Sequence, residues 1–215
     1  MADHQVRTGD GLGHRDIDTV FAQPRDQGIE PFDAPFRPVP SLGVLERQMG
    51  VDALDYDAWQ GDDAAKAWLE GIKANNPTDY PNNTGIVDAV GRGEVEVGFV
   101  NHYYLLRFLA EQGEGFGARN HFPSGDIGGL MNVAGVGIIA QGDTDVAEEL
   151  VDYLLQATAQ TYFAQETGEY PLIDGVASRD GIPTLAELNV PDVDLSNLDD
   201  LRGTLDLMRD AGVLP

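Results

Sequence analysis

The pattern of apolar and polar residues divides the chain near residue 61. Before that point, residues 1–40 carry scattered Pro, Gly, Asp and Arg with little period of 2 or 3.6, which predicts loop or poorly ordered chain. A weak apolar pattern over residues 42–59 predicts no definite element. Beyond residue 61 apolar positions recur at helical and strand spacing, so the folded elements are expected there.

Five segments place apolar residues on one face of a helix. Asp62 or Asp63 is expected to cap the first helix, and Asp145 with Glu148 is expected to form a capping pair at the fourth. Glycines are expected to end the second, third and fifth helices. The predicted apolar faces are Ala65, Trp68, Leu69 and Ile72; Ile86, Val87 and Val90; Leu105, Phe108 and Leu109; Val146, Leu150, Leu154 and Tyr162; and Leu198, Leu201, Leu205 and Met208.

Two strands are predicted between these helices. Val95, Val97 and Phe99 alternate with glutamates and a glycine, which is typical of a strand. Residues 113–131 form a predicted Gly-rich loop, and residues 133–140 are expected to be a buried strand. Helices and strands therefore alternate along the chain, which predicts an α/β fold.

The charge balance changes the picture of the surface. The chain of 215 residues holds 37 acidic and 13 basic residues, a net charge of −24, while 42% hydrophobic residues allow a packed core. Such a field repels phosphate backbones, so nucleic-acid binding is not expected. The favoured interpretation is a surface adapted to very salty surroundings, and the alternative is a surface that attracts cations. Because molar salt shortens the screening length to about 3 Å, specificity must come from a local site.

The absence of cysteine limits the chemistry. Without cysteine there are no disulfides and no thiolate ligands, so a bound metal would be held by oxygen and imidazole, which favours hard ions. No run approaches the roughly 18 apolar residues of a membrane-spanning helix. Residues 1–15 lack the apolar core of a signal peptide, so an export signal is expected to lie outside this sequence.

Two adjacent tyrosines stand where the predicted strand passes into the third helix. Tyr103 and Tyr104 follow Asn101 and His102 in the run VEVGFVNHYYLL. A helix N-terminus favours negative charge, and two phenolate oxygens suit a small, hard, highly charged cation such as Fe³⁺. The alternative is ordinary packing at a helix start, since adjacent helical positions point about 100° apart. Convergence on one ion therefore requires a special local backbone.

Several separated motifs resemble the ferric-iron-binding proteins of ABC importers. They are DDAAKAWLEGIKANNPTDYPNNTGIVDAVGRGEVEVGFVNHYY, GDIGGLMNVAGVGII, YFAQETGEYPLIDGV and LSNLDDLRGTLDLMRDAGV, in the family's order and reaching the C-terminus. The resemblance implies a type II periplasmic-binding-protein fold, mainly its C-terminal lobe. It assigns residues 62–132 plus 185–215 to that lobe and residues 133–184 to a hinge-crossing segment of the N-terminal lobe. Residues 1–61 stay unmatched, so most of the N-terminal lobe is expected to be missing.

The resemblance also implies a site and a function. Tyr103 and Tyr104 match the family's Fe³⁺ ligands, and Asn83 and Asn101 match asparagines that hold a synergistic anion such as phosphate or carbonate. The implied function is non-catalytic capture of ferric iron and delivery to a membrane permease, outside the cell or in the periplasm. The alternatives are a protein of the same fold that binds another solute, and a non-functional remnant. The family's further His and Glu ligands have no match, because His4 and His14 lie in unpatterned sequence.

Other features carry weaker expectations. His102 is expected to orient the tyrosines, His121 to be structural, Asp126 to fix the Gly-rich loop, and the Asp-rich residues 190–200 to be solvated surface. No GxSxG, HExxH or GxxxxGK motif is present, so no enzyme activity is expected. Residues 133–184 are expected to leave apolar surface exposed, which predicts marginal stability or self-association.

Overall fold

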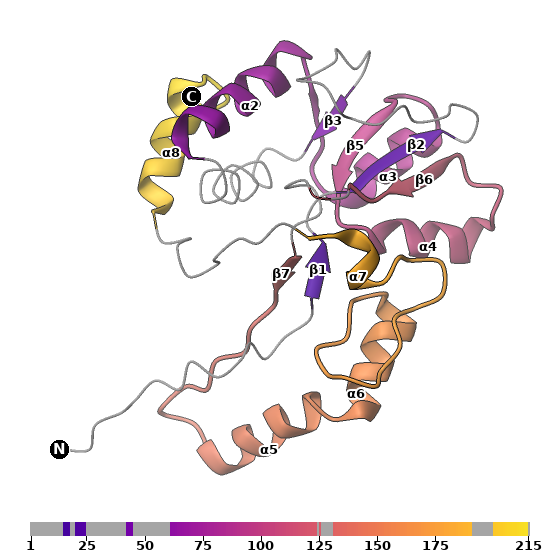
Figure 1. Ribbon diagram of the computed structural model, residues 1–215, viewed down its shortest axis with the longest axis vertical. Coiled ribbons are helices and arrows are strands. Elements are labelled where there is room, and N and C mark those ends of the chain that lie inside the picture. The colour runs from indigo at the N-terminus through magenta and orange to yellow at the C-terminus, as the bar shows by residue number, and fades with distance from the viewer. Residues whose placement is uncertain are drawn as a thin grey trace. The chain divides into compact units, whose positions relative to one another are not determined.

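The computed structural model describes residues 61–123, 125, 131–190 and 200–214, together with the backbone of three short strands nearer the N-terminus (Figure 1). The chain divides into two compact units. The sheet unit comprises Ile17–Leu130 and Leu185–Pro215, and the helical unit comprises Met1–Asp16 and Met131–Thr184. In the described part of the chain, no helix combines the length and apolarity needed to cross a membrane.

The sheet unit is built on a mixed five-stranded sheet in the order β4-β3-β5-β2-β6. β3 runs parallel to both β4 and β5, whereas β2 runs antiparallel to both β5 and β6. The strands are β2 (Val20–Pro24), β3 (Leu42–Val44), β4 (Thr78–Asp79), β5 (Val97–Val100) and β6 (Ala118–His121). A strand from the beginning of the chain thus lies between two strands that follow it by more than 70 residues.

Helices bury the central strand. α2 (Asp62–Ala74) and α8 (Leu201–Asp210) lie side by side, and Leu69, Ile72 and Met208 form a core with Val97 and Phe99 of β5 (Figure 1). α3 (Asn83–Gly91) contacts β5, β2 and β3, and α4 (Tyr103–Gln112) contacts α3 and β6. All four residues of β5 are buried. Because successive side chains of a strand point to opposite faces, helices must cover both faces here.

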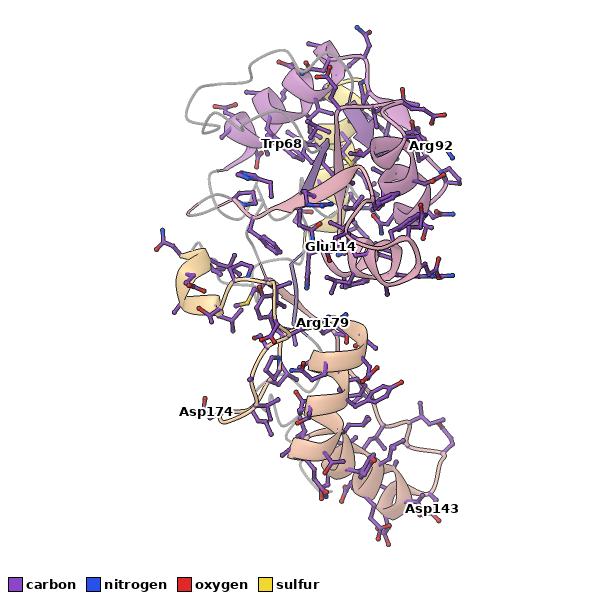
Figure 2. The ribbon with its side chains drawn as sticks, turned by 90° about the vertical axis from the view of Figure 1, so that its right-hand side faces the viewer. Trp68, Arg92, Glu114, Asp143, Asp174 and Arg179 are labelled. Atoms are coloured by element: carbon purple, nitrogen blue, oxygen red, sulfur yellow. The ribbon has the colours of Figure 1, made fainter. Side chains whose placement is uncertain are left out.

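Two helix starts differ from the prediction. Gly61 occupies the N-cap of α2 without a side-chain hydrogen bond, so Asp62 and Asp63 lie in the first turn, where their charge favours the helix dipole. α5 (Thr144–Leu154) begins after Asp143, whose carboxylate accepts a hydrogen bond of 3.3 Å from Val146 N (Figure 2). The predicted Asp145 cap is therefore wrong by two residues, because Asp145 already lies inside the first turn.

Two glycines let α3 approach the segment that leads into β6. A methyl group on Gly117 would overlap the carbonyl oxygen of Gly91, and one on Gly91 would overlap the ring of Phe116. Phe116 in turn stacks on Phe108 of α4, with ring centroids 4.8 Å apart. The absence of a Cβ at these two positions is what allows the backbones to meet.

The helical unit contains little sheet. β1 (Arg15–Ile17) and β7 (Met131–Val133) form a two-stranded sheet, and the chain continues through α5, α6 (Ala157–Tyr162) and a π-helical turn (Phe163–Thr167). Polar side chains tie these pieces together. The buried Gln160 side chain donates to Leu154 O at 2.9 Å and accepts from Leu172 N at 2.8 Å, and the Tyr170 hydroxyl donates to Pro183 O at 2.6 Å.

The buried strand predicted at residues 133–140 is wrong. Strand pairing ends at Val133, and the following residues have no regular structure and are exposed, including Ile139 at 71%. A strand becomes buried only where neighbouring strands and covering helices surround it, and in the described residues β7 pairs with β1 alone. The expected exposure of apolar surface in residues 133–184 is confirmed, with Val146 at 60% and Leu150 at 55%.

Three further expectations concern the chain's divisions and loops. The predicted loop of residues 1–40 is wrong at β1 and β2, where pairing to distant strands supplies the order that local sequence does not signal. The Gly-rich loop of residues 113–131 is likewise interrupted by β6. The predicted lobe boundaries at residues 132 and 184 stay a prediction. Along this part of the chain, the compact units are divided between residues 130 and 131 and between residues 184 and 185.

Candidate functional site

The turn between β5 and α4 positions the predicted iron ligands. β5 ends at Val100, Asn101 and His102 form the connection, and Tyr103 is the first residue of α4. Tyr104 N donates to Asn101 O at 3.2 Å, which closes the turn. His102 occupies the N-cap without donating or accepting a side-chain capping bond. The tyrosines therefore lie at a positive helix end, beyond the carboxyl end of a central strand, where ligands of α/β sheets commonly bind.

The two tyrosine rings lie next to each other. Their centroids are 4.8 Å apart with an interplanar angle of 34°, and both side chains are half-buried. The rings are therefore neither separated nor enclosed in the core. His102 is fully buried, and its ring meets Tyr103 edge-on at 5.5 Å and Phe122 at 5.9 Å. The contact with His102 therefore limits the orientations that the Tyr103 ring can adopt.

The two asparagines predicted to bind an anion contact each other. Asn83 Nδ2 donates to Asn101 Oδ1 at 3.2 Å, and each residue is 7% exposed. Asn82 caps α3 by accepting from Gly85 N at 2.8 Å, so Asn83 is the first residue of that helix. Asn83 Oδ1 is buried and has no hydrogen-bond partner among the described residues. The polar pair thus joins the start of α3 to the residue that follows β5.

Two ionisable side chains of the sheet unit, His121 and Tyr80, have pKa values shifted toward the neutral form. Burial lowers the pKa of His121 at the end of β6, so the imidazole is neutral at ordinary pH. Burial, followed by repulsion from Glu94, raises the pKa of Tyr80, and Arg92 opposes that shift. Within the ranges that the structure describes, no three His, Asp or Glu side chains gather closely enough to hold a metal.

Sequence reasoning missed Asn120. Its Nδ2 donates to the carbonyl oxygen of His102 at 2.8 Å, so β6 contacts the tyrosine turn directly. The residues ARNH of β6 lack the apolar alternation that signals a strand, and they follow a Gly-rich run. No local pattern could have placed this side chain beside the turn. Asp126 and residues 191–199 of the Asp-rich segment lie outside the described residues.

The sequence is similar to those of known iron-binding proteins. No family model matches the chain. The chain is 28% identical over 178 residues to the major ferric iron-binding protein of Neisseria gonorrhoeae, covering 81% of this chain and 52% of that protein. It is 30% identical over 151 residues to iron uptake protein A2 of Synechocystis sp., covering 66% and 44%. The chain therefore spans about half the length of the curated relatives it matches.

The solved structures that resemble this chain are also those of iron-binding proteins. Iron-bound HitA from Pseudomonas aeruginosa aligns with a TM-score of 0.81 and 25% identity over 97% of this chain and 71% of that protein. The apo ferric ion-binding protein A of Pasteurella haemolytica aligns with a TM-score of 0.78 and 22% identity, over 94% and 68%. The predicted α/β, type II periplasmic-binding-protein fold and the predicted resemblance to ferric-iron-binding proteins are confirmed.

Proposed function

We propose that this chain binds ferric iron through Tyr103 and Tyr104 and takes part in iron import. The observation that carries the proposal is the pair of half-buried rings, 4.8 Å apart, at the start of α4. Tyr103 and Tyr104 are the first two residues of α4, and their rings lie together although successive helical positions point about 100° apart. Two phenol oxygens on neighbouring rings offer one hard cation a common approach.

The chemistry of the ligands suits Fe³⁺. Free tyrosine ionises near pH 10, but a highly charged cation displaces the phenolic proton, much as a bound metal ion acidifies its other ligands. Protons then compete with iron, so affinity falls as pH decreases. Capture and release of iron require no covalent change in a substrate, so the proposed role is non-catalytic.

A small anion such as phosphate or carbonate completes the proposed site beside Asn83 and Asn101. Anions accept hydrogen bonds, whereas Asn83 Nδ2 is directed at Asn101 Oδ1. A carboxamide nitrogen carries two N–H donors, so the bond to Asn101 uses one N–H of Asn83 and the second can be offered to an anion. The N-terminus of α3, which Asn83 opens, adds a partial positive charge that favours an anion.

The proposed partner is the permease of an ABC importer, and the proposed location is outside the cytoplasm. One relative is called the Fe(3+)-binding periplasmic protein, which supports the proposed location, and the resemblance to the iron-binding proteins of ABC importers motivates the proposed partner. The net charge of −24 with two lysines, Lys66 and Lys73, supports work in very salty surroundings, where the excess carboxylates maintain solubility.

The function is tested by adding Fe³⁺ with phosphate or carbonate and recording the visible spectrum. We expect a tyrosinate-to-iron absorption band that is lost in Tyr103→Phe and in Tyr104→Phe. Tyr153→Phe and Tyr162→Phe are matched controls, because these tyrosines are 51% and 58% exposed in the helical unit. Dependence on the added anion, reduced by Asn83→Ala or Asn101→Ala, tests the anion site.

Other outcomes of the titration identify other functions. A band that persists in both phenylalanine variants would refute the tyrosine site. Absence of any band, with binding of a different solute, would favour the alternative of a same-fold protein for another ligand. Absence of all binding would favour a non-functional remnant.

We also propose that the exposed apolar face of the helical unit makes the isolated chain self-associate. Val146, Leu150 and Tyr153 are each more than half exposed and follow one another along α5, which has no buried residue. Light scattering should show an apparent mass that rises with concentration and with salt, since salt screens the acidic surfaces. Leu150→Gln should reduce the association, and a monomer under all conditions would refute it.

A further inference from the structure

The peptide group that joins His102 to Tyr103 is the structural link through which the first tyrosine is oriented. Because a peptide group is planar, fixing the direction of the His102 carbonyl also fixes the direction of the Tyr103 N–H and the position of its Cα. The α4 N-cap offers no side-chain capping bond to do this. The backbone bond from Tyr104 N to Asn101 O, at 3.2 Å, lies at the long end of the normal range for N–H···O bonds.

Asn120 contacts this peptide group from a different element. Its Nδ2 lies 2.8 Å from the carbonyl oxygen of His102, across 18 residues of sequence. The backbone of Asn120 is itself held by the β2–β6 ladder, where it lies opposite Ala22, with His121 opposite Phe21. The hydrogen bond therefore connects the tyrosine turn to the sheet. A donor on a paired strand is better fixed than one on a loop.

The oxygen of the Asn120 side chain does not stabilise the fold. Asn120 Oδ1 is buried and has no hydrogen-bond partner among the described residues, and burying an unpaired acceptor is unfavourable. By contrast, the neighbouring Arg119 donates to the carbonyls of Phe116 and Glu114, which supports the loop before β6. The Asn120 side chain therefore makes one hydrogen bond, to the peptide group before Tyr103, and this bond is suited to positioning that peptide group.

We propose that Asn120 is a positioning residue for the tyrosine pair, holding the His102–Tyr103 peptide so that both rings face the same ion. The part concerning iron rests on the proposed function above. Asn120 touches neither tyrosine hydroxyl in this role and acts through the backbone. Outer partners of metal ligands typically change metal affinity about 10–100-fold when removed, and we expect that range here.

The test compares Asn120→Asp and Asn120→Ala with a matched control, Asn75→Asp. Asp keeps the shape of Asn but cannot donate, and Ala also removes the unpaired acceptor, which protects the fold. Asn75 Nδ2 likewise donates to a backbone carbonyl, Gly71 O, at 2.8 Å from a partly buried position at the end of α2. Circular dichroism and thermal melting establish that each variant is folded.

Two measurements are made on the folded variants. In the iron titration, both Asn120 variants should bind Fe³⁺ about 10–100-fold more weakly and shift the tyrosinate band, whereas Asn75→Asp should match the unmodified chain. Without iron, ¹³C-labelled tyrosine ring resonances, assigned with Tyr103→Phe and Tyr104→Phe, should move for both tyrosines in the Asn120 variants alone, since each ring shields its neighbour.

The outcomes separate this proposal from the iron proposal. Ring resonances and iron affinity that match the unmodified chain in both Asn120 variants would overturn the positioning role. If the unmodified chain shows no iron band, the iron proposal fails, and the ring resonances alone then decide whether Asn120 orients the pair. Equal losses in Asn75→Asp and the Asn120 variants would also overturn it, because they would reflect general destabilisation.

Discussion

The sheet unit and the helical unit are each stabilised by a different kind of internal contact. In the sheet unit, fully buried apolar side chains such as Leu69 and Ile72 pack on β5. In the helical unit, α5 buries nothing, and Gln160 and Tyr170 join the segments through hydrogen bonds to backbone groups. Even the loop that carries Asp174 and Arg179 is tied back by a bond from Arg179 to Gln165 O at 2.9 Å (Figure 2).

This difference shows how much order each kind of contact can supply. Apolar burial contributes free energy in proportion to area, so the sheet unit gains stability from every residue of its core. A neutral hydrogen bond adds a net contribution of only about 0.5–1.5 kcal/mol, because water offers a competing partner. The helical unit is therefore shaped by specific polar bonds and leaves its apolar face available to another surface.

The largest expected effect comes from truncating a core leucine. Leu69→Ala should lower the free energy of unfolding by about 2–5 kcal/mol, through lost burial and the cavity left behind, because Leu69 is fully buried. Leu150→Ala in the helical unit is the matched control, since Leu150 is 55% exposed; we expect a change within about 0.5 kcal/mol. Urea denaturation followed by fluorescence measures both. Equal losses would remove the contrast between the units.

The next effect comes from adding a methyl group where backbones touch. Gly117→Ala should cost about 1–3 kcal/mol as an overpacking substitution, because its Cβ would overlap Gly91 O. Gly135→Ala in the helical unit meets no atom within 4 Å and should be neutral or slightly stabilising. Gly115→Ala, equally open, controls for position within the sheet unit. Thermal melting decides; a tolerated Gly117→Ala would show that α3 and β6 can separate.

A smaller and local effect is expected in the helical unit. Gln160→Ala removes the partners of Leu154 O and Leu172 N, which should cost about 1 kcal/mol, because both residues are only partly buried and water can replace the lost partner. Hydrogen exchange should accelerate at the Leu172 amide while β5 amides stay protected. Gln165→Ala is the matched control, because its bond to Ala177 O is exposed. Simultaneous loss of protection in β5 would mean that the units unfold together.

The sequence predicted the sheet unit better than the helical unit for a physical reason. Apolar periodicity identified α2, α3, α4, α8 and β5. Their predicted faces contribute to the core, except that Leu201 of α8 is 60% exposed while Met208 of the same face is buried. The same logic failed at residues 133–140, where apolar residues have no covering layer. β2, β3 and β6 are short, and their order comes from pairing with distant strands, which no local window reports.

The candidate site was predictable in part. The position of Tyr103 and Tyr104 after a strand follows from the pattern, and the resemblance supplied their proposed role. Their close approach at 4.8 Å depends on side-chain orientations in the first turn of α4, and the contact from Asn120 depends on a strand that periodicity did not reveal. Spacing along a chain gives proximity only within one element, so contacts between elements required the structure.

The place of β2 in the sheet has a consequence for the order of assembly. β2 emerges early in synthesis, yet its neighbours β5 and β6 appear only after residue 97. Until then Val20–Pro24 has no strand beside it, and afterwards it bridges the strand before the tyrosines to the strand that carries Asn120. A nascent or clipped chain without this bridge would leave β5 and β6 without the strand that joins them, so the turn that carries Tyr103 and Tyr104 would form only after residues 20–121 are complete.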